Sequence, residues 1–305
     1  MSRRLPPTSV TVGALSLGGC VMTAAGTAGH SDELGAYGDL AALGAVVVKS
    51  LSPEPWAGNP APRLHPMAVG MINSVGLQGP GLPAWIADDL PRLRSSGARV
   101  VVSIWGRSIE DYALAGVLLA NAEVDAIEVN VSCPNLEDRS RMFAHSAEAT
   151  AAAVEAVGTA HPRWVKLSPN TSELVEIAGA ALSAGADALV LTNTVLGMVI
   201  DTEARRPALG NGGGGLSGPA IHAVSVRAIY ECAKAHPDAA IIGVGGISTG
   251  VDAVEMVMAG ASAVQVGTAS LAEPRAPWRI QSEVARWMAD HGVGDLAEVR
   301  GAAHG

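Results

Sequence analysis

Eight short apolar segments, separated by stretches with helix signals, constrain the fold of this chain most strongly. They are continuous in Val, Ile and Leu rather than alternating with polar residues, as is typical of parallel strands covered on both faces. Crossovers between such strands are almost always right-handed, so the pattern predicts an α/β fold, a closed (β/α)8 TIM barrel. A doubly wound open sheet, which would lack closure between the first and last segments, is the alternative. The segments are residues 21–26, 45–50, 99–106, 126–132, 164–168, 188–193, 240–246 and 263–268.

The intervening stretches carry helix-boundary residues. Ser146, Asn170 and Thr249 are expected N-caps, the last two with an acidic residue three positions on. The glycines expected to end these helices are Gly158, Gly185 and Gly260. The length of 305 residues suits one barrel, so we expect residues 1–305 to form a single domain.

The N-terminal stretch has two interpretations. Its arginine pair and the stretch "LSLGGC", which ends at Cys20, resemble a signal peptide with a lipoprotein-type cleavage box. The run "VTVGALSLGG" is glycine-broken and partly alternating, which favours a β-hairpin leading into the first barrel strand. We expect the hairpin because the apolar run is weak and the next segment is needed for the barrel. No run approaches the ~20 apolar residues of a membrane span.

Two spacers, 51–97 and 194–219, exceed the usual length of a loop between strand and helix, and both follow predicted strands. Loops after strand C-termini build the active sites of these barrels, so both long insertions should lie on that face.

Charge and cysteine content exclude several classes. A net charge of -9 leaves no basic stripe for a nucleic-acid partner, although local lysines can still hold small anions. Three cysteines do not make a disulfide framework, and no Cys/His cluster has metal-ligand spacing. We therefore expect no metal site and a location in a reducing cytoplasm.

Polar residues stand where several predicted strands end. A lysine inside an apolar strand is unfavourable without an anionic partner, although a lone one can be a paired structural residue. Two such lysines facing one barrel mouth predict a bound anion. The strand-end residues are Lys49, Asn130 with Cys133, Lys166, and Asn193 with Thr194.

Glycine clusters follow the seventh and eighth strands, in "GVGGIS" and "QVGTAS". Glycines there can simply make tight turns. Their backbone N–H groups can also bind phosphate, and this pair of loops is the usual phosphate site of such barrels. The two clusters together favour phosphate binding.

Cys133 lies in a loop at the predicted barrel mouth. A free thiol has a pKa of about 8.5, and its thiolate can act as a nucleophile or as a base. Both roles remain open from the residues alone. Cys20 and Cys232 lack such a setting, and we interpret them as packing residues.

Eight motifs between about residues 8 and 290 resemble, in order and spacing, those of class 1 dihydroorotate dehydrogenases. They are "VVVKSLSPEPWAGNPAPRL", "GMINSVGLQGPG", "VNVSCPN", "VKLSPN", "LTNT", "GGLSGPAI", "GVGGI" and "VGTAS". "NTVLGMVID" and "GGLSGPAI" are most similar to the class 1B branch, whose catalytic subunit pairs with an FAD and iron–sulfur subunit. The resemblance implies FMN-dependent oxidation of (S)-dihydroorotate to orotate in pyrimidine (UMP) biosynthesis, by a homodimer or heterotetramer.

The resemblance also implies roles for individual residues. Cys133 would remove the C5 proton of dihydroorotate while the C6 hydrogen leaves as hydride to flavin N5. Lys166 would face flavin N1 and O2, where negative charge builds on reduction. The implied substrate-binding residues are Lys49, Asn73, Ser74, Val75, Gly76, Leu77, Asn130, Asn193 and Thr194. The implied cofactor-binding residues are Ala25, Lys49, Ser50, Ser103, Asn130, Lys166, Thr192, Gly218, Gly245, Gly246, Gly267 and Thr268.

Three features depart from or extend the family pattern. Ala25 replaces a serine near the flavin, and Ser103 replaces an asparagine common in the third strand. The polar stretch after Cys133 is interpreted as a lid, with Phe143 as a plug over the site.

Competing functions remain. A flavin barrel could act on another dihydropyrimidine such as dihydrouracil. A Schiff-base lyase would use Lys166 without a flavin. A non-catalytic carrier would bind FMN and dock a partner.

Overall fold

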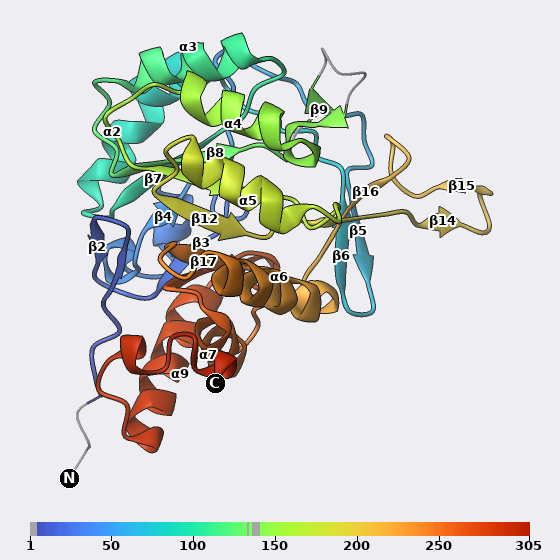
Figure 1. Ribbon diagram of the computed structural model, residues 1–305. Helices are drawn as coiled ribbons and strands as arrows, with labels where there is room; N and C mark the ends of the chain where they lie inside the picture. The colour runs from blue at the N-terminus through green and yellow to red at the C-terminus, as the bar shows by residue number, and fades with distance from the viewer. Residues whose placement is uncertain (1–4, 133, 136–140) are drawn as a thin grey trace.

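The chain, seen in a computed structural model, is described over residues 5–132, 134–135 and 141–305. At its centre lies an eight-stranded sheet with the order β3-β18-β17-β12-β11-β8-β7-β4 and parallel pairing throughout (Figure 1). Each of the eight predicted segments supplies one of these strands. They are β3 Val21–Thr23, β4 Val46–Val47, β7 Val100–Ile104, β8 Ala126–Asn130, β11 Arg163–Lys166, β12 Ala188–Leu191, β17 Ile241–Val244 and β18 Ala263–Val266.

The first and last strands of that order, β3 and β4, also meet. Gly44 N donates to the Val21 carbonyl at 2.8 Å, and Thr23 N donates to the Ala45 carbonyl at 3.3 Å. The Thr23 hydroxyl accepts from Val47 N at 2.8 Å, which stands in for a further backbone bond. These bonds close the sheet, so the barrel prediction is confirmed and the open doubly wound alternative is wrong.

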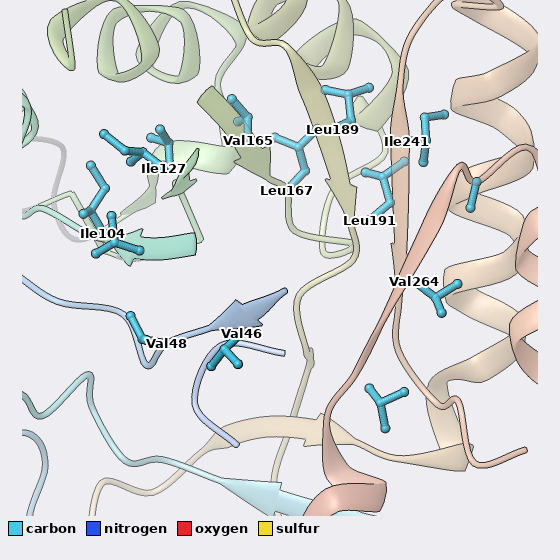
Figure 2. Packing of buried hydrophobic residues seen from close by; sticks show 14 of the residues in the cluster. Val46, Val48, Ile104, Ile127, Val165, Leu167, Leu189, Leu191, Ile241 and Val264 are labelled. Atoms are coloured by element: carbon cyan, nitrogen blue, oxygen red, sulfur yellow. The ribbon is translucent and has the colours of Figure 1, made fainter. Parts of the chain in front are cut away.

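Side-chain alternation along each strand sorts residues between two apolar clusters. Outward-facing residues such as Ile127, Val165 and Leu189 pack between sheet and helices (Figure 2). Inward-facing residues such as Trp164 and Val190 fill the barrel. The outer layer contains α3 Ile109–Leu119, α4 Ala147–Ala156, α5 Leu174–Ser183, α6 His222–Ala235, α7 Gly250–Ala259, α8 Thr268–Ala272 and α9 Ala276–His291.

The predicted N-terminal hairpin is confirmed. Strands β1 (Val10–Val12) and β2 (Leu15–Leu17) pair in antiparallel fashion. Val12 and Leu17 are 0% and 2% exposed and belong to the apolar cluster inside the barrel. The hairpin therefore closes the barrel end at which the strands begin.

Two of the three predicted helix caps are confirmed. The Ser146 side chain accepts from Ala149 N ahead of α4, and Thr249 forms a capping box with Asp252 ahead of α7. The Asn170 cap is wrong, because α5 begins only at Leu174. Asn170 instead ties two loops together: its amide donates to the Thr194 carbonyl at 2.9 Å and accepts from Leu196 N at 2.9 Å.

The two long insertions lie on the same face, as predicted, and form a second sheet. Its order is β13-β16-β6-β5, and the pairing of β16 with β6 joins the two insertions. The strands are β5 Leu64–Met67, β6 Gly70–Asn73, β13 Val195–Gly197 and β16 Gly214–Ser217. The short elements are β9 Pro134–Asn135, β10 Arg141–Met142, β14 Ile200–Asp201, β15 Arg206–Pro207, α1 Leu82–Ala84, a π-helical turn Trp85–Asp89 and α2 Leu90–Ser95.

Within the part of the chain that the structure describes, no helix combines the length and apolarity needed to span a bilayer.

Candidate active site

A cavity of about 660 Å³ lies between the C-terminal ends of the barrel strands and the second sheet. Lys166 comes from strand β11 and Lys49 from just beyond β4, and the insertions contribute the segment 73–77 and a glycine-rich wall. The predicted site residues that line it are Ala25, Lys49, Ser50, Asn73, Ser74, Val75, Gly76, Leu77, Asn130, Lys166, Thr192, Asn193, Thr194, Gly218, Gly245, Gly246, Gly267 and Thr268. Cys133 lies outside the described residues.

Lys166 ends β11 on the cavity floor and is only 5% exposed. Its ammonium lies 3.6 Å from a carboxylate oxygen of Glu128, which is fully buried inside the barrel. Pairing of this kind is what allows a lysine to remain inside an apolar strand. The sequence prediction missed Glu128. Its position two residues before Asn130, on the same face of one strand, was the available signal.

Ser103 does not line the cavity but lies directly beneath it. Its hydroxyl donates to Glu128 at 3.0 Å and contacts the Ser50 hydroxyl at 2.8 Å. Gln265, reaching across the barrel from β18, donates to the other Glu128 oxygen at 2.8 Å. Ser103 is therefore set apart from the predicted site residues that line the cavity, and its contacts lie within this buried polar layer.

Side-chain amides form the centre of the cavity wall. Asn130 accepts from Ser132 N at 3.1 Å and from the Asn193 amide at 3.3 Å. The Asn193 side-chain oxygen accepts from Thr194 N at 2.8 Å. On the opposite wall, Asn73 donates to the Gly215 carbonyl at 3.3 Å. These contacts fix three amides around a shared space.

Lys49 is partly buried in the cavity. Burial lowers the pKa of its ammonium, and the positive charge of Arg63 lowers it further. Both effects disfavour the charged form in the free protein. An anion in the cavity would oppose them, as the sequence analysis expected.

The glycine loops after β17 and β18 leave room for a ligand. Gly245 has φ +128°, and a Cβ there would lie 2.1 Å from the Ser225 hydroxyl oxygen. Gly246 has φ +77°, and its Cβ would lie 2.6 Å from that of His222. Only glycine therefore lets this turn pack against α6, and the glycine backbone itself lines the cavity, which suits a phosphate group.

The start of α7, by contrast, is already satisfied from within the protein. Asp252 accepts from Ser248 N and Thr249 N, each at 2.8 Å, and Glu283 accepts from Gly250 N at 2.7 Å. Any phosphate contact after β17 therefore falls to the glycine turn rather than to the helix terminus.

The predicted Phe143 plug is wrong. Phe143 is fully buried, belongs to the cluster between sheet and helices, and packs edge-on against Tyr112 with ring centres 5.4 Å apart. Its neighbour Met142 lines the cavity instead.

Cys20 and Cys232 are buried, and burial raises the pKa of each thiol to about 12. Neither can supply a thiolate near neutral pH, so the prediction that both are packing residues is confirmed.

Comparisons with known proteins agree on one family. The family model described as dihydroorotate dehydrogenase matches residues 8–288. A protein of Geobacter sulfurreducens named dihydroorotate dehydrogenase B (NAD(+)), catalytic subunit, is 44% identical over 97% of this chain and 98% of its own. Proteins of the same name from Alkaliphilus metalliredigens and Desulforudis audaxviator are each 46% identical, over 96% and 97% of this chain and 97% of their own lengths.

Proposed function

Because the chain belongs to the dihydroorotate dehydrogenase family, we propose that it is a class 1B catalytic subunit that oxidises (S)-dihydroorotate to orotate in pyrimidine biosynthesis. The observation that carries this proposal is the shared cavity. It brings Lys49, Lys166, three asparagine amides and two glycine loops together in about 660 Å³.

The residues present fit FMN as the flavin. A phosphate can approach the backbone at Gly245, Gly246 and Gly267, where side chains are absent and a Cβ at Gly245 or Gly246 would collide with neighbours. Lys166 on the floor would hold the pyrimidine end of the ring system, where its charge stabilises electron density gained on reduction. When bound, the flavin supplies the two-electron acceptor for the hydride that leaves C6 of dihydroorotate.

The remaining polar wall suits dihydroorotate. Lys49 would pair with the substrate carboxylate, which opposes the burial that disfavours its charge. The amides of Asn73, Asn130 and Asn193 would hydrogen-bond the ring oxygens and N–H groups. Substrates that leave such partly buried groups unpaired are rejected by large factors, whereas a pocket without them discriminates weakly.

We propose Cys133 as the base that takes the C5 proton. The segment leading to it is tied to the site: Ser132 N donates to Asn130, and the Ser132 hydroxyl donates to the Lys166 carbonyl at 3.5 Å. The chain continues from Ser132 directly into Cys133, whose thiolate would act as the base. The C5 proton of dihydroorotate passes to the sulfur while the electron pair of the C5–H bond forms the new C5–C6 double bond.

The names of the relatives indicate assembly with another subunit. We propose that an FAD and iron–sulfur subunit carries electrons from this chain to NAD, in a heterotetramer built on a homodimer. The single-domain organisation of residues 1–305 and the cytoplasmic location both stay predictions.

The function is tested by steady-state oxidation of dihydroorotate and of dihydrouracil with an artificial electron acceptor. We expect a yellow protein that forms orotate from dihydroorotate at a rate far above that for dihydrouracil. A colourless protein whose Lys166 is trapped by borohydride in the presence of a carbonyl substrate would instead establish the Schiff-base lyase. Preference for dihydrouracil would establish the other dihydropyrimidine activity.

A further inference from the structure

Glu128 is a fully buried carboxylate to which the proposed chemistry gives no role. Three donors converge on it: the Ser103 hydroxyl at 3.0 Å, the Gln265 amide at 2.8 Å and the Lys166 ammonium at 3.6 Å. An ionised carboxylate only accepts hydrogen bonds, so this arrangement suits the charged form. Its negative charge lies directly under the lysine that we place against the flavin.

A chain of hydrogen bonds leads from Glu128 up to the cavity. The Ser103 hydroxyl contacts Ser50 at 2.8 Å, and Ser50 accepts from the Asn130 amide at 3.4 Å. A serine hydroxyl has one proton, and that of Ser103 goes to Glu128. The proton between the two serines therefore belongs to Ser50. Glu128 thus decides which group donates and which accepts in each hydrogen bond of the chain, from Ser103 to Asn130.

The cavity end of the chain independently requires the same direction. The backbone N–H of Ser132 can only donate, and it points at the Asn130 side-chain oxygen at 3.1 Å. The nitrogen of that amide must then face Ser50, whose oxygen is free to accept because its proton is turned toward Ser103. Both ends agree, so the orientation of the Asn130 amide is locked by a backbone N–H on one side and by Glu128 on the other.

We propose that Glu128 is a positioning residue that affects the active site in two ways. Through Lys166 it offsets the positive charge on the cavity floor, which lowers the reduction potential of the bound flavin. Through Ser103 and Ser50 it orients the Asn130 amide toward the pyrimidine ring. The inference rests on the proposed function, since it takes the floor as the flavin side and Asn130 as a substrate contact.

Two variants separate the effect on the flavin potential from the effect on the Asn130 amide, and a third is a matched control. Glu128→Gln removes the negative charge but keeps one acceptor oxygen, which Ser103 and Lys166, both donors to the same oxygen, would hold on their side. Ser103→Ala breaks the chain but keeps the carboxylate. Ser262→Ala removes another buried serine hydroxyl, one for which the described residues provide no hydrogen-bond partner. Each purified flavoprotein is measured for its flavin midpoint potential against a redox dye and for its orotate dissociation constant from the perturbed flavin absorption.

In Glu128→Gln we expect the preference for reduced over oxidised flavin to rise about tenfold, a positive shift of about 30 mV for a two-electron couple. In Ser103→Ala the orotate dissociation constant should rise about tenfold, equivalent to about 1.4 kcal/mol, because the Asn130 amide is then held by the Ser132 N–H but no longer oriented by Ser50, and its hydrogen bond to the ring weakens. Ser103→Ala should show the orotate effect at the wild-type potential, and Ser262→Ala should show neither effect.

An unchanged orotate dissociation constant in Ser103→Ala, or an unchanged or lower potential in Glu128→Gln, overturns the inference. If Glu128→Gln does not accumulate as a folded flavoprotein, Ser103→Ala, which deletes one oxygen atom, decides alone. Reduction of the wild-type flavin by dihydroorotate supports the proposed function whatever the variants show, and absence of that reduction counts against the proposed function itself.

Discussion

Replacing Lys166 by methionine should destabilise the fold through the carboxylate that it leaves behind. The lysine and Glu128 side chains are 7% and 0% exposed, so little solvent can compensate the loss. Breaking one side of a buried ion pair typically costs 3–5 kcal/mol, because the remaining charge has no partner. Glu128 keeps its hydrogen bonds from Ser103 and Gln265. We therefore expect the lower end, about 3 kcal/mol.

The double variant Lys166→Met/Glu128→Gln should recover most of that loss. Once the carboxylate is also removed, no charge is buried unpaired, and the deficit relative to wild type should fall to about 1 kcal/mol. Both variants lack the lysine, so any lost flavin contact is common to them and cancels in the comparison.

The assay is urea-induced unfolding of the wild type, the single variant and the double variant. The matched control is Arg227→Met, which breaks the exposed pair with Glu231 on α6, where the side chains are 78% and 43% exposed. That change should cost less than about 0.5 kcal/mol. If Lys166→Met is as stable as the wild type, or if the double variant is no more stable than Lys166→Met, the reasoning about the buried pair is refuted.

Three further predictions concern the ligands. Gly245→Ala should raise the FMN dissociation constant of the apoprotein at least about tenfold, because it combines φ +128° with a Cβ 2.1 Å from Ser225. Gly292→Ala, with φ +70° and no atom within 4 Å of its Cβ, should leave FMN affinity unchanged. Equal FMN affinities for the two variants would contradict phosphate binding at the Gly245 turn. Because burial lowers the pKa of Lys49, its positive charge is complete below that pKa and is lost as pH rises through it. Orotate affinity, followed by flavin absorption, should fall as pH rises through the pKa of Lys49 in the wild type and not in Lys49→Gln; parallel profiles would exclude the role of Lys49. Cys133→Ala should bind FMN and orotate normally but lose turnover with dihydroorotate at neutral pH, and near-normal turnover would exclude Cys133 as the base.

The barrel could be predicted from the sequence because parallel strands buried on both faces leave a strong local pattern. Each of the eight apolar segments supplies a strand, and each strand ends two or three residues before the predicted segment does, where the chain turns toward the cavity. The second sheet could not be predicted, because β6 and β16 lie on different insertions and pair only once the barrel has brought those insertions together.

The cavity-lining residues could be predicted from polar groups at strand ends and from family resemblance, whereas the layer below them could not. Glu128 and Gln265 lie inside apolar strands and meet across the barrel, 137 positions apart in the chain. The prediction for Phe143 was wrong for a related reason, because the neighbouring sequence does not indicate that Phe143 packs against the ring of Tyr112. Contacts between distant strands decide such positions, and no short motif records them.

The central claim is that dihydroorotate delivers a hydride inside this cavity, and it is tested most directly by rapid anaerobic mixing of the flavoprotein with dihydroorotate. Followed at the visible flavin band, the wild-type absorbance should bleach within the time of one turnover, without any partner subunit, and one orotate should form for each flavin reduced. A flavin that keeps its colour at saturating dihydroorotate would contradict the account.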